Sequence, residues 1–457
     1  MIRPDFNKTV HFIGIGGISM SSLAMILISR GVKVSGSDSK ESELTASLRQ
    51  KGAVINIGQS KDNITADIGM VVYTAAIAKD NPELKRAMEL GISCVSRAEF
   101  LGQLMKDYKN AVCVSGTHGK TTTTSLISQI LLDADADPTI LVGGMLPIIG
   151  GNTRIGRSDC FLTEACEYTN SFLSFFPTTA VILNVKADHL DFFKDLDDIR
   201  SSFRTFAGLL PEDGTLIING EIDRLDYFTA DLNCDIITFG LKEGLDFTAA
   251  DISFNDLAGA GFNVIHDNEY IGHVQLLIPG MHNVYNALAA IAAAYSLGID
   301  MDTALKAVGR FEGVDRRFQI KGSLGGVTVI DDYAHHPDEI AATLSAAADF
   351  PHKKLWLVFQ PHTYSRTKAL LDEFAAELSK ADAVILADIY AARETDNLGI
   401  SSLDLKDKIS SLGTECYYFP TFDEIENFLL ENCAPKDMFI TMGAGDVVKI
   451  GDFLLGR

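Results

Sequence analysis

Short apolar runs alternate with helical segments along most of the chain, and the first such run leads into a glycine turn. The strands predicted in the first part are Thr9–Ile15, Val32–Ser37, Ala53–Ile57 and Gly69–Tyr73, and the helices are Ile18–Arg30 and Pro82–Leu90. Apolar strands joined by helices in this way are typical of a parallel sheet buried on both faces. This part therefore predicts a Rossmann-like domain, which we place at residues 1–108.

The alternation continues in two further parts of the chain. In the middle part we predict strands at Ala111–Val114, Cys160–Thr163 and Thr179–Val185, helices at Thr121–Leu132 and Asn283–Ser296, and β-rich segments between residues 215 and 278. In the last part we predict strands at Val327–Ile330, Leu355–Phe359, Ala383–Leu386 and Met438–Thr441, and helices at Asp338–Ala348 and Lys368–Ser379. The patterns predict an α/β protein of three domains, with a central domain of mixed sheet at 109–320 and a second Rossmann-like domain at 321–457.

The chain is acidic, with 61 Asp and Glu residues against 39 Lys and Arg among 457, which gives a net charge of −22. This balance argues against a nucleic-acid binder, which usually carries a basic face or stripe. The longest run of small apolar residues, Ala287–Ile299, is shorter than the roughly 20 residues of a membrane span. The start of the chain mixes charge, proline and asparagine, unlike a signal peptide. We expect a cytoplasmic monomer or homodimer with no nucleic-acid or membrane partner.

The stretch SGTHGKTT, from Ser115 to Thr122, stands between a predicted apolar strand and a predicted helix. In such a turn, backbone N–H groups and the positive end of the helix dipole can surround phosphate oxygens. Lys120 would reach the β and γ phosphates, and the Thr121 hydroxyl would bind Mg²⁺. The strict motif is not met, because Val114 stands where its first glycine belongs. The stretch predicts a variant loop for a nucleoside triphosphate, and it makes the central domain at 109–320 P-loop ATPase-like.

A second glycine turn lies near the N-terminus, where Gly14, Gly16 and Gly17 follow the first predicted strand. Asp38 ends the next strand, as the acidic residue of a dinucleotide fingerprint does, but Ser19 replaces the third glycine of that fingerprint. The turn leaves three interpretations open: NAD, another diphosphate-linked molecule, or a structural turn. We favour the second, because a chain with an ATP loop gives little reason for a hydride carrier.

Two polar clusters, Glu164–Glu167 and Lys186–Asp191, directly follow predicted strands of the middle domain. They should project from the carboxyl edge of the sheet, where open α/β sheets bind ligands. Carboxylates and a histidine near phosphates suit Mg²⁺, which keeps water and phosphate oxygens in its remaining positions. Alone, the Asp188–His189 pair would more readily be interpreted as a solvated loop. Two such clusters downstream of a GKT loop favour a metal site.

The later part of the chain is rich in polar groups at the ends of predicted elements. They are His282, Asn283, Asn286, Arg316, Arg317, Asp331, Asp332, Tyr333, His335, His336, Gln360, His362, Tyr364 and Arg366. Individually each could be a cap, a hinge or a surface residue. Together they surround linkers and strand ends, which predicts ligands held in clefts between domains.

These residues fall within stretches that resemble the successive motifs of the Mur ligases. The stretches are FIGIGGISMSSLA, VSGTHGKTTTT, LTEACEYTNSF, LNVKADHLDFF, PGMHNVYNALAA, GVDRRFQ, VIDDYAHHPDEI, FQPHTYSRT and ITMGAGD. The set is most similar to the alanine-adding branch of this family and runs from about residue 11 to 446 in the family's order. The resemblance implies ATP- and Mg²⁺-dependent joining of L-alanine to the carboxylate of UDP-N-acetylmuramate, through an acyl phosphate, in cytoplasmic peptidoglycan synthesis.

The resemblance also implies a role for each residue that matches a motif. For the UDP-substrate these are Gly14, Gly16, Gly17, Ser19 and Asp38; for ATP, Gly116, Thr117, His118, Gly119, Lys120, Thr121, Thr122, His282, Asn283, Asn286, Arg316 and Asp331; for the amino acid, Tyr333, His335, His362 and Arg366; and for Mg²⁺, Thr121, Glu164 and His189. Lys120, His189, Asn283, His362 and Arg366 are implied to take part in catalysis.

Two departures from the family pattern bear on the substrate. Mur ligases that add later residues carry a carbamylated lysine about a dozen residues after the DH pair, whereas Ile199–Arg204 contains no lysine, in agreement with the alanine-adding branch. Some members have arginine where this chain has Thr363, which leaves glycine or L-serine open as further substrates. The alternatives are the recycling ligase that joins a whole tripeptide, a nicotinamide-dependent oxidoreductase, and a P-loop switch or nucleotide sensor. Neither of the last two uses the His and Arg residues of the third domain.

Overall fold

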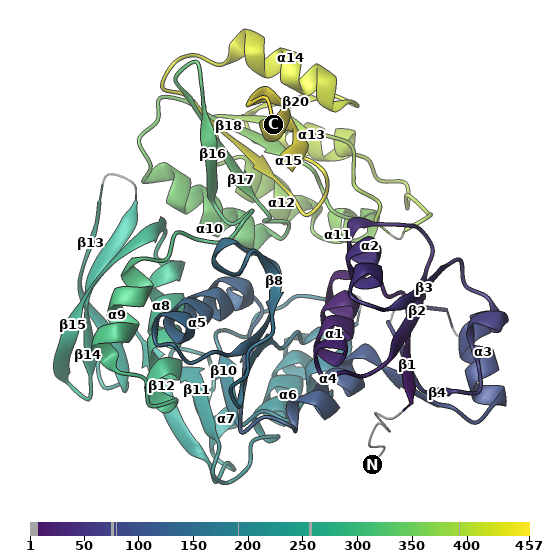
Figure 1. The fold of residues 1–457 in the computed structure, drawn as a ribbon. Coiled ribbons are helices and arrows are strands. Elements are labelled where there is room, and N and C mark those ends of the chain that lie inside the picture. Colours follow the sequence, from purple (N-terminus) through teal and green to yellow (C-terminus); the bar gives the residue numbers. More distant parts are fainter. Residues whose placement is uncertain (1–7, 75–76, 79, 191, 256–257, 393) are drawn as a thin grey trace. The chain divides into compact units, whose positions relative to one another are not determined.

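The computed structural model describes residues 8–74, 77–78, 80–190, 192–255, 258–392 and 394–457, and it contains three β-sheets flanked by helices (Figure 1). The predicted α/β class is confirmed. By residue contacts the chain separates into two compact units, Met1–Thr248 with Ile265–Tyr270 and Tyr285–Ala307, and Ala249–Val264 with Ile271–Val284 and Val308–Arg457. Among the described residues, no helix has the length and apolar character needed to cross a membrane.

The first sheet is the predicted Rossmann-like sheet. Its elements are β1 (Thr9–Ile13), α1 (Ile18–Ser29), β2 (Val34–Asp38), α2 (Glu43–Gln50), β3 (Val54–Ile57), β4 (Ile68–Tyr73), α3 (Pro82–Glu89), β5 (Ser93–Ser96) and α4 (Arg97–Met105). The strand order is β3-β2-β1-β4-β5, with every pair parallel. The order reverses between β1 and β4, which is where open sheets of this kind bind ligands. β1 is shorter than predicted because Gly14, with φ of 83°, leaves the strand.

The second sheet is mixed, as predicted. Its elements are β6 (Asn110–Ser115), α5 (Lys120–Asp133), β7 (Thr139–Leu146), β8 (Gly151–Arg154), β9 (Cys160–Glu164), η3 (Tyr168–Ser174), β10 (Thr179–Ile182), α6 (Leu196–Ala207), β11 (Thr215–Asn219), α7 (Leu225–Thr229), β12 (Asp235–Gly240), β13 (Phe247–Phe254), β14 (Gly259–His266), β15 (Glu269–Pro279), α8 (His282–Ser296) and α9 (Met301–Gly309). The strand order is β15-β14-β13-β12-β11-β10-β6-β9-β7-β8, and β8 runs antiparallel to β7. β6 therefore lies between β10 and β9, both parallel to it. This arrangement sets the carboxyl ends of three strands side by side.

The third sheet is again Rossmann-like, with one antiparallel edge strand. Its elements are β16 (Gln319–Leu324), β17 (Val327–Asp332), α10 (Pro337–Ala348), β18 (Leu355–Phe359), α11 (Tyr364–Ala369), α12 (Leu371–Leu378), β19 (Ala383–Leu386), α13 (Ser402–Ser411), β20 (Glu415–Tyr418), α14 (Phe422–Asn432), β21 (Met438–Met442) and α15 (Val448–Leu454). The order is β16-β17-β21-β18-β19-β20, in which only β16 is antiparallel to its neighbour. The single helix predicted at Lys368–Ser379 is wrong at its start, because the helical path breaks at Leu370 and leaves α11 and α12 as separate helices.

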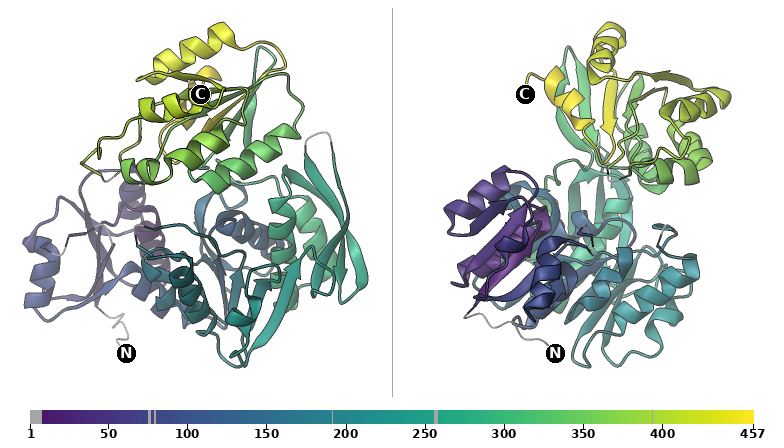
Figure 2. Two further views of the ribbon diagram at one scale, coloured as in Figure 1. Left: turned by 180° about the vertical axis from the view of Figure 1, so that it is seen from behind. Right: turned by 90° about the vertical axis from the view of Figure 1, so that its right-hand side faces the viewer.

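Helices cover both faces of this third sheet, as Figure 2 shows. Alternate residues of β18 explain why: Leu357 and Phe359 join the apolar cluster made with α10, α12 and α13, whereas Trp356 and Val358 join the cluster made with α14 and α15. Successive side chains of a strand point to opposite faces. A strand that is apolar at every position is therefore stable only with both faces covered.

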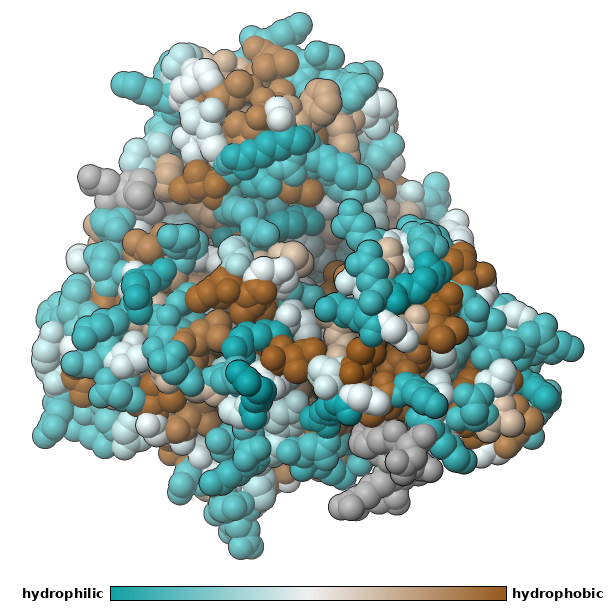
Figure 3. Space-filling view, in the orientation of Figure 1, coloured by the Kyte–Doolittle hydropathy of each residue, from teal (hydrophilic) through white to brown (hydrophobic). Residues whose placement is uncertain are grey.

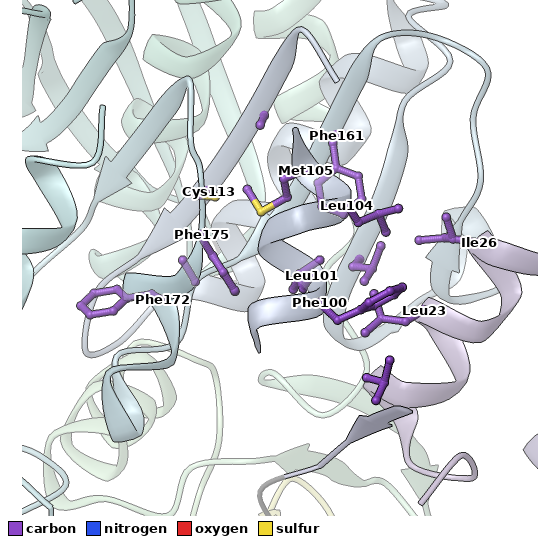
Figure 4. Close-up of a cluster of buried hydrophobic side chains, with 14 of the residues drawn as sticks. Leu23, Ile26, Phe100, Leu101, Leu104, Met105, Cys113, Phe161, Phe172 and Phe175 are labelled. Atoms are coloured by element: carbon purple, nitrogen blue, oxygen red, sulfur yellow. The ribbon is translucent and has the colours of Figure 1, made fainter. Parts of the chain in front are cut away.

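In the first unit, α4 packs against α1 on one side and η3 on the other (Figure 4). Leu23 of α1 and Phe100 of α4 belong to one buried cluster with Phe172 of η3. The helix approaches η3 closely at Gly102, where an added Cβ would lie 1.9 Å from the carbonyl oxygen of Ser174. Glycine is thus required at this point of α4.

Replacing Gly102 by alanine should destabilise the first unit by about 1–3 kcal/mol, because the new methyl group must displace a backbone carbonyl. Gly208, at the end of α6, is the matched control, since its Cβ would meet nothing closer than 3.4 Å. We measure the melting temperature of the first unit, and we expect Gly208→Ala to leave it unchanged or to raise it slightly. Equal melting temperatures for the two variants would contradict the close packing of α4 on η3.

Candidate functional site

The predicted phosphate loop lies between β6 and α5. Gly116 and Gly119 have φ values of 142° and 87°, which L side chains rarely adopt, and Gly119 is the N-cap of α5. No side chain among the described residues caps this helix. Its first N–H groups and its dipole are therefore available to an anion. Val114, which departs from the strict motif, is a fully buried residue inside β6, so the turn begins after it.

The loop is tied to the segment that follows β10, and these contacts were not predicted. The side-chain oxygen of Asn184 accepts from the backbone N–H of His118 at 2.9 Å, and its amide donates to the His118 carbonyl at 3.0 Å. The hydroxyl of Thr117 accepts from the Lys186 N–H at 2.9 Å. These bonds explain why β10 stops at Ile182 and not at the predicted Val185, since the chain here pairs with the loop.

Lys120, the first residue of α5, turns its ammonium group back into the loop. Its Nζ donates to the carbonyl oxygens of Gly116 at 2.5 Å and Thr117 at 3.1 Å, and to Glu167 Oε2 at 3.0 Å. Burial opposes the charged form, but Glu167, with further help from Glu164, outweighs it and raises the pKa of Lys120. Lys120 is thus a charged group within the loop. Glu167 belongs to a cluster singled out in the sequence, but its pairing with this lysine was not predicted.

Glu164 ends β9, directly beside the phosphate loop. It pairs in register with Val114 of β6, and its Oε1 accepts from the Gly143 N–H at 2.6 Å. Thr121 lies in the first turn of α5 with its side chain nearly buried. A carboxylate and a hydroxyl at the mouth of a phosphate loop are the oxygen ligands that Mg²⁺ prefers. These two residues therefore fit the predicted metal site.

His189 lies in the segment after β10 with φ of 53°, and its ring packs 4.6 Å from the ring of Tyr168. Its backbone N–H donates to Asp188 Oδ1 at 2.6 Å. The role of His189 as a ligand of Mg²⁺ stays a prediction. Asp191, the last residue of this cluster, lies outside the described residues.

Helix α8 carries His282, Asn283 and Asn286. Asn286 reaches the phosphate loop, since its Oδ1 accepts from the Thr123 hydroxyl at 3.2 Å and would lie 2.5 Å from a Cβ at Gly119. Asn283 donates to the Pro279 carbonyl at 2.7 Å, and the His282 ring packs against Gly280. Of the three, only Asn286 belongs to the same compact unit as the loop.

The N-terminal glycine turn is the second predicted anion site. The Gly16 N–H donates to Asp38 Oδ2 at 2.8 Å, and a Cβ at Gly16 would lie only 2.8 Å from that oxygen. Gly17 is the N-cap of α1, no side chain in the described part of the chain caps this helix, and Ser19 in its first turn is exposed. The turn therefore leaves the start of α1 open to a phosphate. In the structure Asp38 holds the glycine turn in place through its hydrogen bond with Gly16.

Arg316 and Asp331 form one buried network in the second unit. Arg316 Nε donates to Asp331 Oδ2 at 3.0 Å, and its terminal nitrogen donates to the Gly443 carbonyl at 2.6 Å. Thr441 donates to Asp331 Oδ1 at 2.7 Å, and Asp331 is fully buried. Burial raises the pKa of Asp331 even though Arg316 and Thr441 oppose the shift. In the structure Asp331 accepts a hydrogen bond from Arg316. A contact of Asp331 with ATP stays a prediction.

The predicted amino-acid residues cluster where β17 and β18 end. The rings of His335 and His362 lie 5.6 Å apart, and those of Tyr333 and His335 lie 5.4 Å apart. Arg366 approaches His362 Nδ1 at 3.4 Å, and because a guanidinium only donates, Nδ1 accepts. Burial, with His335 and Arg366 nearby, lowers the pKa of His362 to about 4. Burial likewise lowers the pKa of His335, against the pull of Glu339. Both imidazoles are neutral at pH 7.

Helix α11, which carries Arg366, is anchored by a residue that was not predicted. Glu394 accepts from the backbone N–H groups of Tyr364 at 2.6 Å and Ser365 at 3.1 Å, and from the Ser365 hydroxyl. A carboxylate at a helix N-terminus satisfies N–H groups that have no partner within the helix. Glu394 therefore fixes the position from which Arg366 extends.

Asp332 and His362 should give the second unit opposite dependences of stability on pH. Burial raises the pKa of Asp332 to about 6, so the folded state keeps a proton that the unfolded state loses, and stability falls as pH rises from about 4 to 6. The lowered pKa of His362 acts in reverse, so stability falls as pH drops from about 6.5 to 4.

The measurement is hydrogen exchange of β17, β18 and β21, corrected for the chemical rate, between pH 4 and 6.5. Compared with the wild type, Asp332→Asn should give a more positive slope of protection against pH. His362→Gln should give a more negative slope. The same change of slope in both variants would contradict these assignments.

Comparisons with known proteins cover all three sheets. The family model described as "Mur ligase family, catalytic domain" matches residues 9–109, "Mur ligase middle domain" matches 114–294, and "Mur ligase, glutamate ligase domain" matches 316–445. Proteins named UDP-N-acetylmuramate--L-alanine ligase are 58% identical in Lachnospira eligens and 56% in Agathobacter rectalis, with all of both chains covered.

Two solved structures bear on the fold and on the alternatives. The UDP-N-acetylmuramate-alanine ligase of Thermotoga maritima is 31% identical with a TM-score of 0.81, covering 98% of this chain and 99% of that one. A murein peptide ligase of Psychrobacter arcticus is 26% identical with a TM-score of 0.72, covering 98% of both. With the phosphate loop, the glycine turn and all three sheets matched from end to end, this chain belongs to the Mur ligase family.

Proposed function

We propose that this chain joins L-alanine to the carboxylate of UDP-N-acetylmuramate in peptidoglycan synthesis, with cleavage of ATP to ADP and phosphate. One observation carries the proposal: a chain similar over its full length to ligases of this name has two glycine turns, Gly14–Ser19 and Gly116–Thr122, each of which opens a helix at a glycine N-cap. Two such turns suit a reaction with two nucleotide substrates. Both nucleotides are cytoplasmic metabolites, so we place the enzyme in the cytoplasm.

The reaction solves the problem that a carboxylate is a poor acylating agent. The carboxylate oxygen attacks the γ phosphorus of ATP, which releases ADP and leaves an acyl phosphate. The amine of L-alanine then attacks the acyl carbon, and inorganic phosphate leaves from the tetrahedral intermediate as the amine loses its proton. Catalysis depends mainly on positioning and on neutralising the charge of the phosphoryl group.

For ATP, the N–H groups of Gly116–Thr122 would surround the phosphates, and Lys120 would neutralise the phosphoryl group in transit. Asn286 already touches this loop through Thr123. For His282, Asn283, Arg316 and Asp331 the family resemblance also implies contacts with ATP. Thr121, Glu164 and His189 would hold Mg²⁺, which when bound neutralises charge on the phosphate oxygens.

The other two substrates have their own groups of residues. The UDP diphosphate would lie on the open start of α1, at Gly14, Gly16, Gly17 and Ser19, with Asp38 near the uridine. Tyr333, His335 and His362 would form the alanine pocket, where Arg366 would pair with the alanine carboxylate. The neutral His362 accepts from Arg366 and so aims the guanidinium without competing for its charge.

The test is phosphate release from ATP in the presence of Mg²⁺, UDP-N-acetylmuramate and L-alanine. We expect release only when both acceptor substrates are present. Release that needs neither would contradict the proposal and indicate a nucleotide switch. Replacing L-alanine by the tripeptide tests the recycling alternative, and parallel reactions with glycine and L-serine measure how strictly the pocket selects its amino acid.

A further inference from the structure

Glu167 is a buried carboxylate beside the phosphate loop to which neither the family resemblance nor the proposed chemistry gives a role. Its side chain is 3% exposed, and its two oxygens lie 3.3 and 3.0 Å from Lys120 Nζ. The same ammonium group donates to the carbonyls of Gly116 and Thr117. An ammonium group has three protons, so these three residues occupy all of its donors. Lys120 can therefore donate to a phosphate only by giving up one of these three partners.

The segment that carries Glu167 is held firmly in place. The Asn170 N–H donates to the Glu167 carbonyl at 2.8 Å, and the Phe172 N–H donates to the Cys166 carbonyl at 3.2 Å. Phe172 is fully buried and stacks on Phe206 of α6, with ring centroids 4.6 Å apart and an interplanar angle of 6°. Lys120, by contrast, extends on a flexible four-carbon chain. When the pair opens, the lysine is therefore the partner that moves.

A triphosphate in the loop competes with Glu167 for the same ammonium group. We propose that Glu167 is a positioning residue that holds Lys120 against the carbonyls of the loop. ATP must take Lys120 from this ion pair, so the cost of opening the pair lowers the affinity of the loop for the nucleotide. This inference rests on the proposed function, because it takes the ligand of the loop to be ATP. Glu167 keeps a charged, buried lysine satisfied between turnovers, and the pair re-forms when the nucleotide leaves.

The test is calorimetric titration of a non-hydrolysable ATP analogue with Mg²⁺ into the full chain. For Glu167→Gln we expect the Kd to fall by about tenfold, because the lysine no longer has to leave a charged partner. Glu167→Asp, whose carboxylate is one methylene shorter, should lower the Kd by less. Glu99→Gln is the matched control, since Glu99 is an exposed carboxylate that caps its own helix, and its Kd should equal that of the wild type.

A double-mutant cycle distinguishes an effect of Glu167 that acts through Lys120 from direct repulsion between the Glu167 carboxylate and the phosphates. In a Lys120→Met background, Glu167→Gln should change the Kd by less than about twofold. A tenfold fall in that background would overturn the proposal, because removal of the charge alone would then explain it. Weaker nucleotide binding by Glu167→Gln, or a raised Mg²⁺ requirement, would also overturn it and make Glu167 a ligand of the metal or nucleotide.

The outcome also separates this inference from the proposed function. A wild-type chain that does not bind the analogue contradicts the assignment of the loop to ATP. If the wild type and Glu167→Gln bind the analogue with the same Kd, the proposed role of Glu167 is contradicted, while the assignment of the loop to ATP is not. Glu167→Asp keeps the test decisive if the glutamine variant fails to fold, because the aspartate retains the charge that Lys120 needs.

Discussion

Lys120→Met should reduce kcat by at least about a thousandfold, the scale of effect seen when a preorganised charge that stabilises a transition state is removed. Methionine keeps a similar length and apolar stem but lacks the ammonium group. In the structure that group lies among the carbonyls of the phosphate loop, and, against the effect of burial, the neighbouring Glu167 raises its pKa. Because the charge acts on the phosphoryl group in transit, the loss should appear in kcat at saturating substrates, measured as phosphate release.

Misfolding is the main competing explanation for such a loss. Lys120→Met leaves Glu167 buried without its partner, which costs about 3–5 kcal/mol. The double variant Lys120→Met/Glu167→Gln removes both charges and should recover wild-type thermal stability while staying inactive. Lys194→Met, at an exposed lysine in the same domain, is the control and should keep full activity. Turnover within tenfold of wild type in the folded double variant would remove Lys120 from the mechanism.

Strands buried on both faces could be predicted from the sequence almost residue by residue. Leu355–Phe359 and Ala383–Leu386 were predicted with the bounds that the structure has. Every position of these strands is apolar because each faces one of two helical layers, so the pattern starts and stops with the strand itself. The same reasoning placed the first and third sheets as Rossmann-like.

Short helices with mixed faces were not predicted, although some carried a usable signal. Helices α4 and α14 each begin with a capping box, in which Ser96 pairs with Glu99 and Thr421 with Glu424. The pattern of Ser or Thr followed three residues later by Glu marks such a start. The break at Leu370 gave no such signal, because α11 is oriented by Glu394 from a distant segment.

Motif residues of the site could be predicted, whereas the residues that hold them could not. Asn184 and Glu394 hold backbone N–H groups, and Glu167 holds the Lys120 side chain. Their roles depend on which strands are neighbours. β6 lies between β9 and β10, which come much later in the chain, and only this order brings Glu167 and Asn184 to the phosphate loop.

The acidic balance of the chain limits where its anionic substrates can bind. With a net charge of −22, most carboxylates must face solvent, and polar side chains cover much of the face seen in Figure 3. Lys120, Arg316 and Arg366 are instead buried or half-buried, each held by a hydrogen bond from its side chain. We therefore expect the binding of both nucleotides to depend on a few cations and open helix starts, and not on long-range attraction.

Arg366→Ala should lower kcat/KM for L-alanine by about 100- to 1000-fold, mostly through KM. This corresponds to about 3–4 kcal/mol, within the range lost when one partner of a desolvated charge pair is removed. Arg366→Lys should recover little, because a lysine keeps the charge but not the planar fork that binds a carboxylate through two parallel bonds. The KM values for ATP and UDP-N-acetylmuramate should stay within about threefold.

The control for Arg366 lies on the same helix. Lys368 is exposed and donates to the Leu398 carbonyl at 2.8 Å, so Lys368→Ala removes a cation of α11 without touching the histidine cluster. Its KM for L-alanine should match the wild type. Because Glu394 anchors the start of α11, Glu394→Gln should raise the KM for L-alanine by a smaller factor than Arg366→Ala does. If Arg366→Ala changes the three KM values equally, Arg366 supports the fold and not the alanine carboxylate.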